Sequence, residues 1–385
     1  MAIKDGKQPH PETIAAQALG GIDTASGALV PPVHISATYE RDADNLYSKG
    51  LVYARPHNPT TRLAEEVITT LEGGADAFAF ASGMAAAVAV FDSLAAGDHV
   101  VAPKVMYWAL RNWLATKLVS RGIEVSFVDM SDMSDLEMAI QKDRTRIVWT
   151  ETPANPLWTI TDIARVAELA HNRGAILVVD STVATPVFTN PISLGADIVM
   201  HSATKYLNGH SDVLAGVLVT RAVDDNWRAI AATRSGSGAI LGPQQAALLL
   251  RGMRTLHLRV RAASGAAQKI ADHFHGHQRV DQVVYPGLPN HPGHDVAARQ
   301  MRGGFGAMVS VRIKGGEQAA IAVASRVRVW KRATSLGGVE SLIEHRASIE
   351  GPGTIVPADL LRLSVGVEHV DDLIEDIEQA LILTQ

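Results

Sequence analysis

Short apolar runs alternate with amphipathic stretches through the middle of the chain, and this alternation limits the possible folds more than any other feature. The apolar runs are 76–82, 99–103, 124–129, 146–151 and 175–180, followed by DIVMHSA and VLAGVLVT. The stretches between them have the hydrophobic period of helices. Apolar strands that alternate with helices predict a mostly parallel sheet with helices on both faces, which is the α/β class.

The two ends of the chain differ from this central region. Residues 1–58 show little periodicity and carry scattered glycine, proline and threonine, so we expect an extended arm. A long helical pattern covers about 243–275, and the remainder mixes strands with helices, which predicts a smaller α/β domain. The expected division is an arm at 1–58, a large cofactor-binding domain at 59–250 and a C-terminal domain at 251–385.

Composition excludes several classes of protein. The net charge of −5 among 385 residues offers no basic surface for nucleic acid or an anionic membrane. The chain has no cysteine, which excludes disulfides, thiolate metal sites and cysteine nucleophiles. No apolar stretch is long enough to span a membrane, and the N-terminus lacks a signal-peptide core, so a cytoplasmic location is expected. We expect His291 and His294 to lie exposed in a Pro/Gly loop and to bind no metal.

Polar residues stand where several predicted strands end. Ligands of open α/β sheets bind at the carboxyl ends of the strands. Ser82-Gly83-Met84 follows one apolar run and opens a helix, where glycine permits close approach and free N–H groups attract an anion. Most strand–glycine–helix joins are only tight turns, so this signal alone is weak.

Two later strand ends carry a carboxylate and an amine. Asp180 needs a cationic or hydrogen-bonding partner if it is buried, although a capping role explains a single aspartate equally well. Lys205 in an apolar pocket would be a nucleophilic amine, although a lone lysine more often extends to solvent. Ser202 and Thr204 stand beside Lys205 and offer hydrogen bonds to a phosphate. An anion site, a carboxylate and an amine together match the needs of pyridoxal 5′-phosphate, whose protonated ring accepts electrons from a substrate carbon.

The segment SATKYLNGHSDVLAG resembles the cofactor-lysine signature of the Cys/Met-metabolism (transsulfuration) family of pyridoxal-phosphate enzymes. YARPHNPTTRLAEEVITTLEGG, ASGMAA, ETPANP, VVDST, TSLGGVESL and LLRLSVG are similar to further family motifs, and the resemblance runs nearly the whole chain. The family includes cystathionine γ-synthase, cystathionine γ- and β-lyases and methionine γ-lyase. The resemblance implies the aspartate aminotransferase-like fold, fold type I, with a smaller C-terminal α/β domain.

The resemblance also implies a role for each matching residue. Lys205 would form an imine with the cofactor and move protons, Asp180 would pair with the pyridinium, and Tyr107 would stack on the ring. The other implied contacts are Ser82, Gly83, Met84, Ser202 and Thr204 with the phosphate, Tyr53 and Arg55 with the phosphate of a neighbouring subunit, and Arg362, Asn155 and Ser335 with the substrate carboxylate. Because two of these residues would serve another subunit, the resemblance implies a homotetramer arranged as a dimer of dimers.

Three positions depart from the family pattern. Relatives that bind cystathionine carry a glutamate where this chain has Thr334 and an arginine where it has Asn112. Trp108 follows the stacking tyrosine, where the family has glycine. The charge partners for the distal end of cystathionine are therefore missing, and an indole face is offered to an apolar or planar cationic group. We expect these three residues to shape the substrate pocket.

We therefore expect a lyase or γ-replacing transferase that acts on a homoserine-type amino acid with an O- or S-linked γ-substituent. Canavanine, O-acyl-homoserine and methionine are the candidate substrates. The alternative is a cystathionine γ-synthase, γ-lyase or β-lyase. A nicotinamide site at GSGAILG (236–242) is weaker, because these glycines follow a helix-like stretch. A regulator that only binds the cofactor disagrees with the presence of Tyr107, Asp180, Lys205 and Arg362.

Overall fold

The computed structural model describes residues 9–351 and 353–383. These residues divide into two compact units. One unit contains the described residues up to Leu94 together with Asp197–His257. The other contains Ala95–Ala196 and the described residues from Leu258 onward. The division expected from the sequence into an arm and two domains stays a prediction.

The first unit packs three strands against helices. Its elements are α1 (Pro11–Gln17), the short helix η2 (Ala18–Gly20), α2 (Pro59–Glu72), β1 (Asp76–Phe80), α3 (Gly83–Phe91), β6 (Ile198–His201), β7 (Gly216–Thr220), α8 (Asp225–Ser237) and α9 (Pro243–Met253). Strand β7 pairs antiparallel with β1 on one side and with β6 on the other. Since β1 and β6 both run opposite to β7, their carboxyl ends lie at the same edge. That edge is where the sequence places its candidate phosphate residues.

The second unit holds four parallel strands and a separate sheet. The parallel strands β2 (His99–Pro103), β3 (Glu124–Val128), β4 (Thr145–Glu151) and β5 (Ile176–Asp180) lie in the order β5-β4-β2-β3. The other sheet has the order β10-β11-β12-β9-β8, with bounds Lys331–Arg332, Leu342–His345, Leu360–Ser364, Met308–Ile313 and Val280–Val284. The helices are α4 (Trp108–Trp113), the π-helical η3 (Leu114–Leu118), α5 (Met133–Ala139), α6 (Ile163–Asn172), α7 (Thr185–Phe188), η4 (Pro191–Leu194), α11 (His294–Gln300), α12 (Gly316–Arg326), α13 (Arg346–Glu350) and α14 (Val370–Ile382). Helix α10 (Leu256–Phe274) leads from the first unit into the second.

The predicted alternation of strands and helices is confirmed from β1 to β6, whereas β6 and β7 follow one another without a helix and pair antiparallel. Helix α2 precedes the first of these strands, and Asn58 caps it through hydrogen bonds from the N–H groups of Thr60 and Thr61. It ends at Gly73, whose φ of 70° lies in the left-handed region that glycine adopts without strain. No helix within residues 9–351 and 353–383 is long and apolar enough to cross a membrane. The cytoplasmic location stays a prediction.

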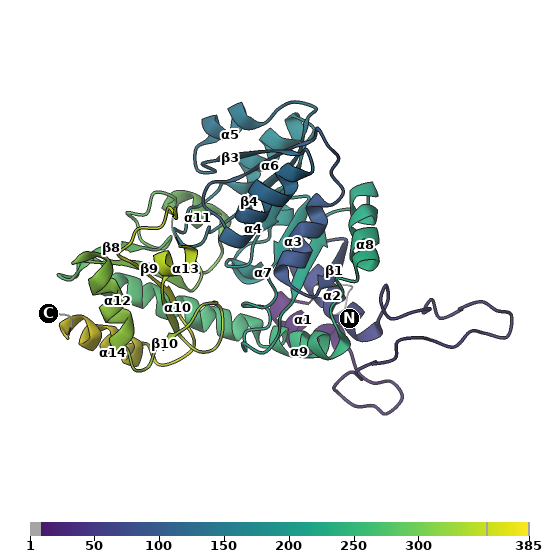
Figure 1. The fold of residues 1–385 in the computed structure, drawn as a ribbon. Helices are drawn as coiled ribbons and strands as arrows, with labels where there is room; N and C mark the ends of the chain where they lie inside the picture. Colours follow the sequence, from purple (N-terminus) through teal and green to yellow (C-terminus); the bar gives the residue numbers. More distant parts are fainter. Residues whose placement is uncertain (1–8, 352, 384–385) are drawn as a thin grey trace. The chain divides into compact units, whose positions relative to one another are not determined.

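Two expectations about helices are wrong. The arm expected at 1–58 is not extended throughout, because Pro11–Gln17 form α1; long loops lie between α1 and α2 (Figure 1). The helical stretch expected over 243–275 is two helices that meet at Arg254–Thr255. The break follows Gly252, where an added Cβ would lie 2.2 Å from the carbonyl oxygen of Asn208. The last turn of α9 therefore packs tightly on the loop that carries Asn208.

Candidate functional site

The candidate phosphate residues gather at the carboxyl edge of the first unit's strands. Ser82 caps α3, its Oγ accepting a hydrogen bond from the N–H of Ala85 at 3.1 Å. Gly83 opens the helix close to the loop that follows β6, so an added Cβ at Gly83 would lie 2.9 Å from Oγ of Ser202. Met84 follows in the first turn of α3, where backbone N–H groups have no partner within the helix. Ser82, Gly83 and Met84 therefore form a cradle with Ser202. It has backbone N–H donors and a hydroxyl, and no room for a side chain at Gly83.

The loop after β6 carries Lys205 in a turn fixed by backbone hydrogen bonds. The N–H of Lys205 donates to the carbonyl of Ser202 at 3.0 Å, and the Lys205 carbonyl accepts from Gly209 at 2.8 Å. Thr204 ties this turn to the strand beside it, because its Oγ1 accepts from the N–H of Ala215 at 3.0 Å. The lysine side chain is half-buried. A rigid turn thus presents an amine beside the anion cradle.

Tyr53 and Arg55 lie on the arm, and both are exposed. The Arg55 guanidinium lies 5.9 Å from the centre of the Tyr53 ring and donates to the carbonyl of Ser235 at 2.7 Å. The neighbouring-subunit role of this pair stays a prediction.

In the second unit, Asp180 ends β5 and is buried. Its Oδ1 accepts from the N–H and the hydroxyl of Thr182, at 3.0 Å and 2.6 Å. In the β4–β5 register it stands opposite Glu151. Glu151 accepts hydrogen bonds from the backbone N–H of Tyr107 at 2.7 Å and of Asn155 at 2.8 Å. Burial, together with the neighbouring charge of Asp180, raises the pKa of Glu151 to about 8.

The sequence reading missed Glu151 as a site residue. It was visible by the reasoning that selected Asp180, because it too is an acidic residue that ends an apolar run, RIVWTE. Its two backbone contacts fix the segment that carries Tyr107 and the segment that carries Asn155. Two candidate side chains are therefore positioned by one buried carboxyl group.

Arg362 is the centre of another group of candidate site residues in the second unit. It is 4% exposed in β12, and its Nη1 donates to Oδ1 of Asn155 at 3.0 Å while its Nη2 donates to the carbonyl of Ser335 at 2.8 Å. The structure thus brings together all three residues expected at the substrate carboxylate. Ser335 has a φ of 96°, an uncommon conformation for a residue other than glycine, and Thr334 before it is exposed. Glu344 also contacts Arg362, at 2.6 Å, and was missed because the pairing depends on strand register.

The expected pocket residues on α4 are accessible. Tyr107 and Trp108 are 42% and 39% exposed, and their rings meet edge to face with centroids 6.5 Å apart. Asn112 is exposed. The neighbouring Arg111 lies over the ring of Phe127, 4.7 Å from its centre, so it packs on an aromatic face. A cavity of about 540 Å³ within this unit is bounded by Arg111, Phe127 and Glu151, among others.

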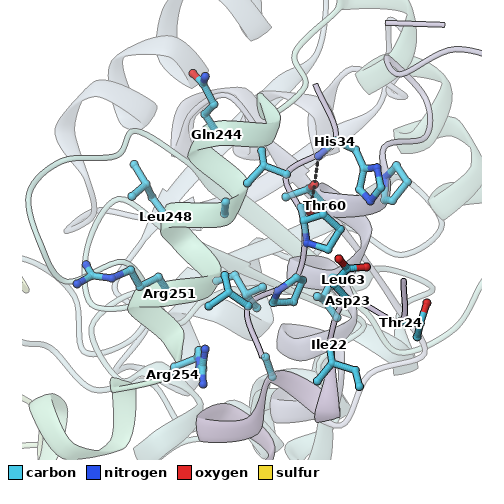
Figure 2. A pocket seen from close by; sticks show the side chains of 18 residues that line it. Ile22, Asp23, Thr24, His34, Thr60, Leu63, Gln244, Leu248, Arg251 and Arg254 are labelled. Atoms are coloured by element: carbon cyan, nitrogen blue, oxygen red, sulfur yellow. Dashed lines mark hydrogen bonds between the residues drawn. The ribbon is translucent and has the colours of Figure 1, made fainter. Parts of the chain in front are cut away.

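Another cavity, of about 880 Å³, lies in the first unit between the arm and helices α2 and α9 (Figure 2). His34 on the arm donates through its backbone N–H to Oγ1 of Thr60 on α2 at 2.9 Å. Leu248 of α9 and Ile22 of the arm also line it. The residues that line this cavity include none of the expected site residues.

Two secondary expectations are resolved by the structure. His291 is buried, so the expectation that it is exposed is wrong; burial lowers its pKa to about 4. Its Nδ1 accepts from the N–H of Gly293 at 3.1 Å. Among the described residues, no group of three or more histidine, aspartate or glutamate residues is arranged to hold a metal. Gly238 ends α8 instead of opening a helix, which removes the basis for a nicotinamide site.

The arrangement is similar along its whole length to known enzymes. A model of the Cys/Met metabolism PLP-dependent enzyme family matches residues 12–382. Cystathionine gamma-synthase of Mycobacterium tuberculosis is 44% identical over 379 residues, which cover 96% of each chain. L-methionine gamma-lyase of Fusobacterium nucleatum is 40% identical over 380 residues, covering 94% of this chain and 95% of the relative. The crystal structure of metB from Corynebacterium glutamicum superposes with a TM-score of 0.94 at 40% identity, covering 98% and 99% of the two chains.

These matches define an enzyme that uses pyridoxal 5′-phosphate and has the α/β fold expected from the sequence. The chain belongs to the Cys/Met metabolism family of PLP-dependent enzymes, whose named members here include γ-synthases and γ-lyases. The residues of the cradle fit the phosphate of this cofactor. The N–H groups that open α3 and the hydroxyl groups of Ser82 and Ser202 lie together there, and Gly83 has no side chain to cover them.

The raised pKa of Glu151 gives a pH-dependent stability. Because the pKa of Glu151 is about 8 in the folded state and 4.5 in an unfolded chain, the folded protein holds a proton on Glu151 between these two pH values that the unfolded chain has lost. Folded protein therefore binds more protons, and the free energy of unfolding falls as pH rises between the two pKa values. Relative to Glu151→Gln, the wild type is expected to lose about 1.4 kcal/mol for each pH unit between roughly 5 and 7.5 in urea titrations. Glu168→Gln, at an exposed glutamate, is the control; equal slopes in all three proteins would contradict the assignment.

Proposed function

We propose that this enzyme catalyses γ-elimination or γ-replacement on an amino acid that carries an O- or S-linked γ-substituent. The observation that carries the proposal is the buried Arg362, which is fixed by Asn155 and by the Ser335 carbonyl. A planar guanidinium held this way is suited to pair with the two oxygens of a carboxylate. Every amino-acid substrate has such a group, so this cluster orients the substrate by its invariant end.

The residues that match the family's motifs would hold the cofactor. The N–H groups of Gly83 and Met84 and the side chains of Ser82, Ser202 and Thr204 would receive the phosphate. Asp180 would accept a hydrogen bond from the ring nitrogen, and Tyr107 would stack on the ring. When bound, pyridoxal 5′-phosphate withdraws electrons from the substrate Cα. Lys205 would supply the amine that binds it.

Lys205 would transfer the protons. Its free Nζ would take the proton from Cα and give it up to the bound cofactor, and only then take one from Cβ, which must leave before the γ-substituent departs. The Cβ proton would then be available to the departing group. General acid–base transfer of this kind contributes about 10²- to 10⁴-fold to the rate. The Tyr107 phenolic oxygen would assist by accepting a hydrogen bond from the substrate amino group.

The distal part of the pocket favours substrates other than cystathionine. Thr334 and Asn112 offer no charge to a distal ammonium or carboxylate group, and Trp108 offers an accessible aromatic face. Canavanine, O-acyl-homoserines and methionine are therefore the proposed candidates. The second candidate is a cystathionine γ-synthase or γ-lyase reaction, which is supported by the 44% identity to the mycobacterial cystathionine gamma-synthase. A cystathionine β-lyase reaction is the remaining alternative.

The arm supports a homotetramer in which Tyr53 and Arg55 complete a neighbouring site. It carries apolar side chains that are largely exposed, including Leu29 at 78%, Ile35 at 74% and Leu46 at 62%. Exposed apolar groups at this density are typical of surfaces that another subunit covers. Arg55 itself is accessible, and its guanidinium donates to the backbone carbonyl of Ser235 and lies near the Tyr53 ring.

A substrate panel tests the proposal. Purified enzyme loaded with cofactor is given cystathionine, methionine, O-acetyl- and O-succinyl-homoserine, canavanine and cysteine, and release of 2-oxo acid or homoserine is measured. At least one γ-substituted substrate other than cystathionine should have a kcat/KM about 10-fold above that of cystathionine, because a lost charge partner costs this much or more. Cystathionine as the best substrate by that margin would overturn the reading of Thr334 and Asn112.

A further inference from the structure

A buried glutamate lies between two buried arginines behind the proposed carboxylate site. Oε2 of Glu344 is 2.6 Å from Nη2 of Arg362 and 3.2 Å from Nη1 of Arg346. Nε of Arg346 donates in turn to Oε1 of Glu350 at 3.0 Å. Glu344, Arg346 and Arg362 are 6%, 2% and 4% exposed. Water therefore screens these charges less than it screens charges at the protein surface.

Glu344 alone would oppose the function proposed for Arg362. A carboxylate in contact with that guanidinium cancels its charge and repels a second carboxylate that approaches it. Strand pairing makes the contact permanent, because Glu344 stands directly opposite Arg362 in the β11–β12 register. An arginine meant to bind an anion therefore needs the charge of this glutamate to be compensated.

Arg346 is placed to supply that compensation. It shares the same oxygen of Glu344 with Arg362, and its charge also reaches Glu151, whose pKa it lowers against the larger effect of burial. Nη2 of Arg346 and Oε1 of Glu344 are buried and have no hydrogen-bond partner among the described residues. Each residue of this ion pair therefore has a buried polar atom without a hydrogen bond, which is unfavourable for an ion pair that serves only stability.

We propose that Arg346 is a positioning residue that neutralises Glu344, so that Arg362 keeps a net positive charge for the α-carboxylate of the amino acid. This proposal rests on the role proposed above for Arg362. Arg346 does not touch the substrate; it acts through Glu344. Glu350 accepts a hydrogen bond from Nε of Arg346, which leaves Nη1 directed at Glu344. The Glu350 side chain is more exposed than that of Glu344, at 12% against 5%, so water screens its charge better and it offsets the charge of Arg346 only in part.

The competing explanation is that Arg346 only anchors α13 to β11. Both explanations allow Arg346→Met to lower stability. They differ in what happens when the charge of Glu344 is also removed. If Arg346 is only an anchor, glycine binding should stay weak. If Arg346 compensates the charge of Glu344, glycine binding should recover, because no carboxylate then opposes Arg362.

The test uses the cofactor-loaded enzyme and two probes, glycine and methylamine, which differ by one carboxylate. Binding of each is measured by titration of the absorbance of the bound cofactor. Arg346→Met should weaken glycine about 10-fold or more, while methylamine changes less than about twofold. The double variant Glu344→Gln/Arg346→Met should return glycine to within about threefold of the wild type. Arg346→Lys, which retains the charge, should bind glycine closer to the wild type than Arg346→Met does and provides a second readout if Arg346→Met fails to fold.

Arg362→Met separates the two proposals. If it leaves glycine binding unchanged, the function proposed for Arg362 fails, and this inference fails with it. If it weakens glycine while Arg346→Met does not, or if the double variant binds no better than Arg346→Met, only the inference about Arg346 is overturned. Equal weakening of glycine and methylamine by Arg346→Met would also overturn it, since only glycine carries the carboxylate.

Discussion

Replacing Lys205 with alanine is expected to lower kcat/KM by at least about 1,000-fold, because in the proposed function one side chain both binds the cofactor and moves protons at Cα and Cβ. The backbone should tolerate the change. The turn is held by main-chain hydrogen bonds from Lys205 to Ser202 and from Gly209 to Lys205, which alanine retains. The loss therefore reports chemistry and not folding.

Covalent trapping gives a direct readout for Lys205. Treating the cofactor-loaded wild type with borohydride should fix the cofactor mass on the peptide that contains residue 205, and Lys205→Ala should carry no such label. Lys142→Ala, at an exposed lysine of the second unit, is the matched control and should be labelled like the wild type. A label on any other lysine of the wild type would contradict the assignment.

Asp180→Asn is expected to lower kcat by roughly 100- to 1,000-fold, because in the proposed function Asp180 is the buried charge partner of the cofactor ring. The substitution isolates the charge. Asparagine keeps an oxygen that can accept from the N–H and hydroxyl of Thr182, as Oδ1 of Asp180 does at 3.0 Å and 2.6 Å. The turn after β5 should therefore survive.

Steady-state kinetics at saturating cofactor measure the effect of Asp180→Asn. Asp132→Asn is the control, since Asp132 caps α5 through its side chain and asparagine caps helices equally well. It should match the wild type. A kcat for Asp180→Asn within about threefold of the wild type would show that the buried carboxylate is not the ring-nitrogen partner.

Local sequence predicted the residues whose roles depend on where a strand ends. Asp180 and Lys205 each follow an apolar run, and the loop after each run is where α/β sheets bind ligands. The cradle at Gly83 also follows a strand end, but it was indicated only weakly, because most glycines between a strand and a helix serve tight turns. These signals need only the order of residues along the chain.

Residues whose roles depend on tertiary packing were not predictable in this way. The contact of Glu344 with Arg362 requires the antiparallel β11–β12 register, which no local pattern specifies. The 243–275 pattern is helical on both sides of Arg254–Thr255, so it predicts one helix where the structure has α9 and α10. The burial of His291 likewise comes from the fold around a loop whose composition suggests exposure.

The position of bond cleavage tests the central claim most directly. L-Cystathionine can be cut on either side of its sulfur, so its products identify the carbon at which the enzyme acts. Incubation of the cofactor-loaded enzyme with this compound and mass analysis of the 2-oxo acid should give a four-carbon acid together with cysteine, as cleavage at Cγ requires. Pyruvate together with homocysteine would place the cleavage at Cβ and contradict the proposed reaction.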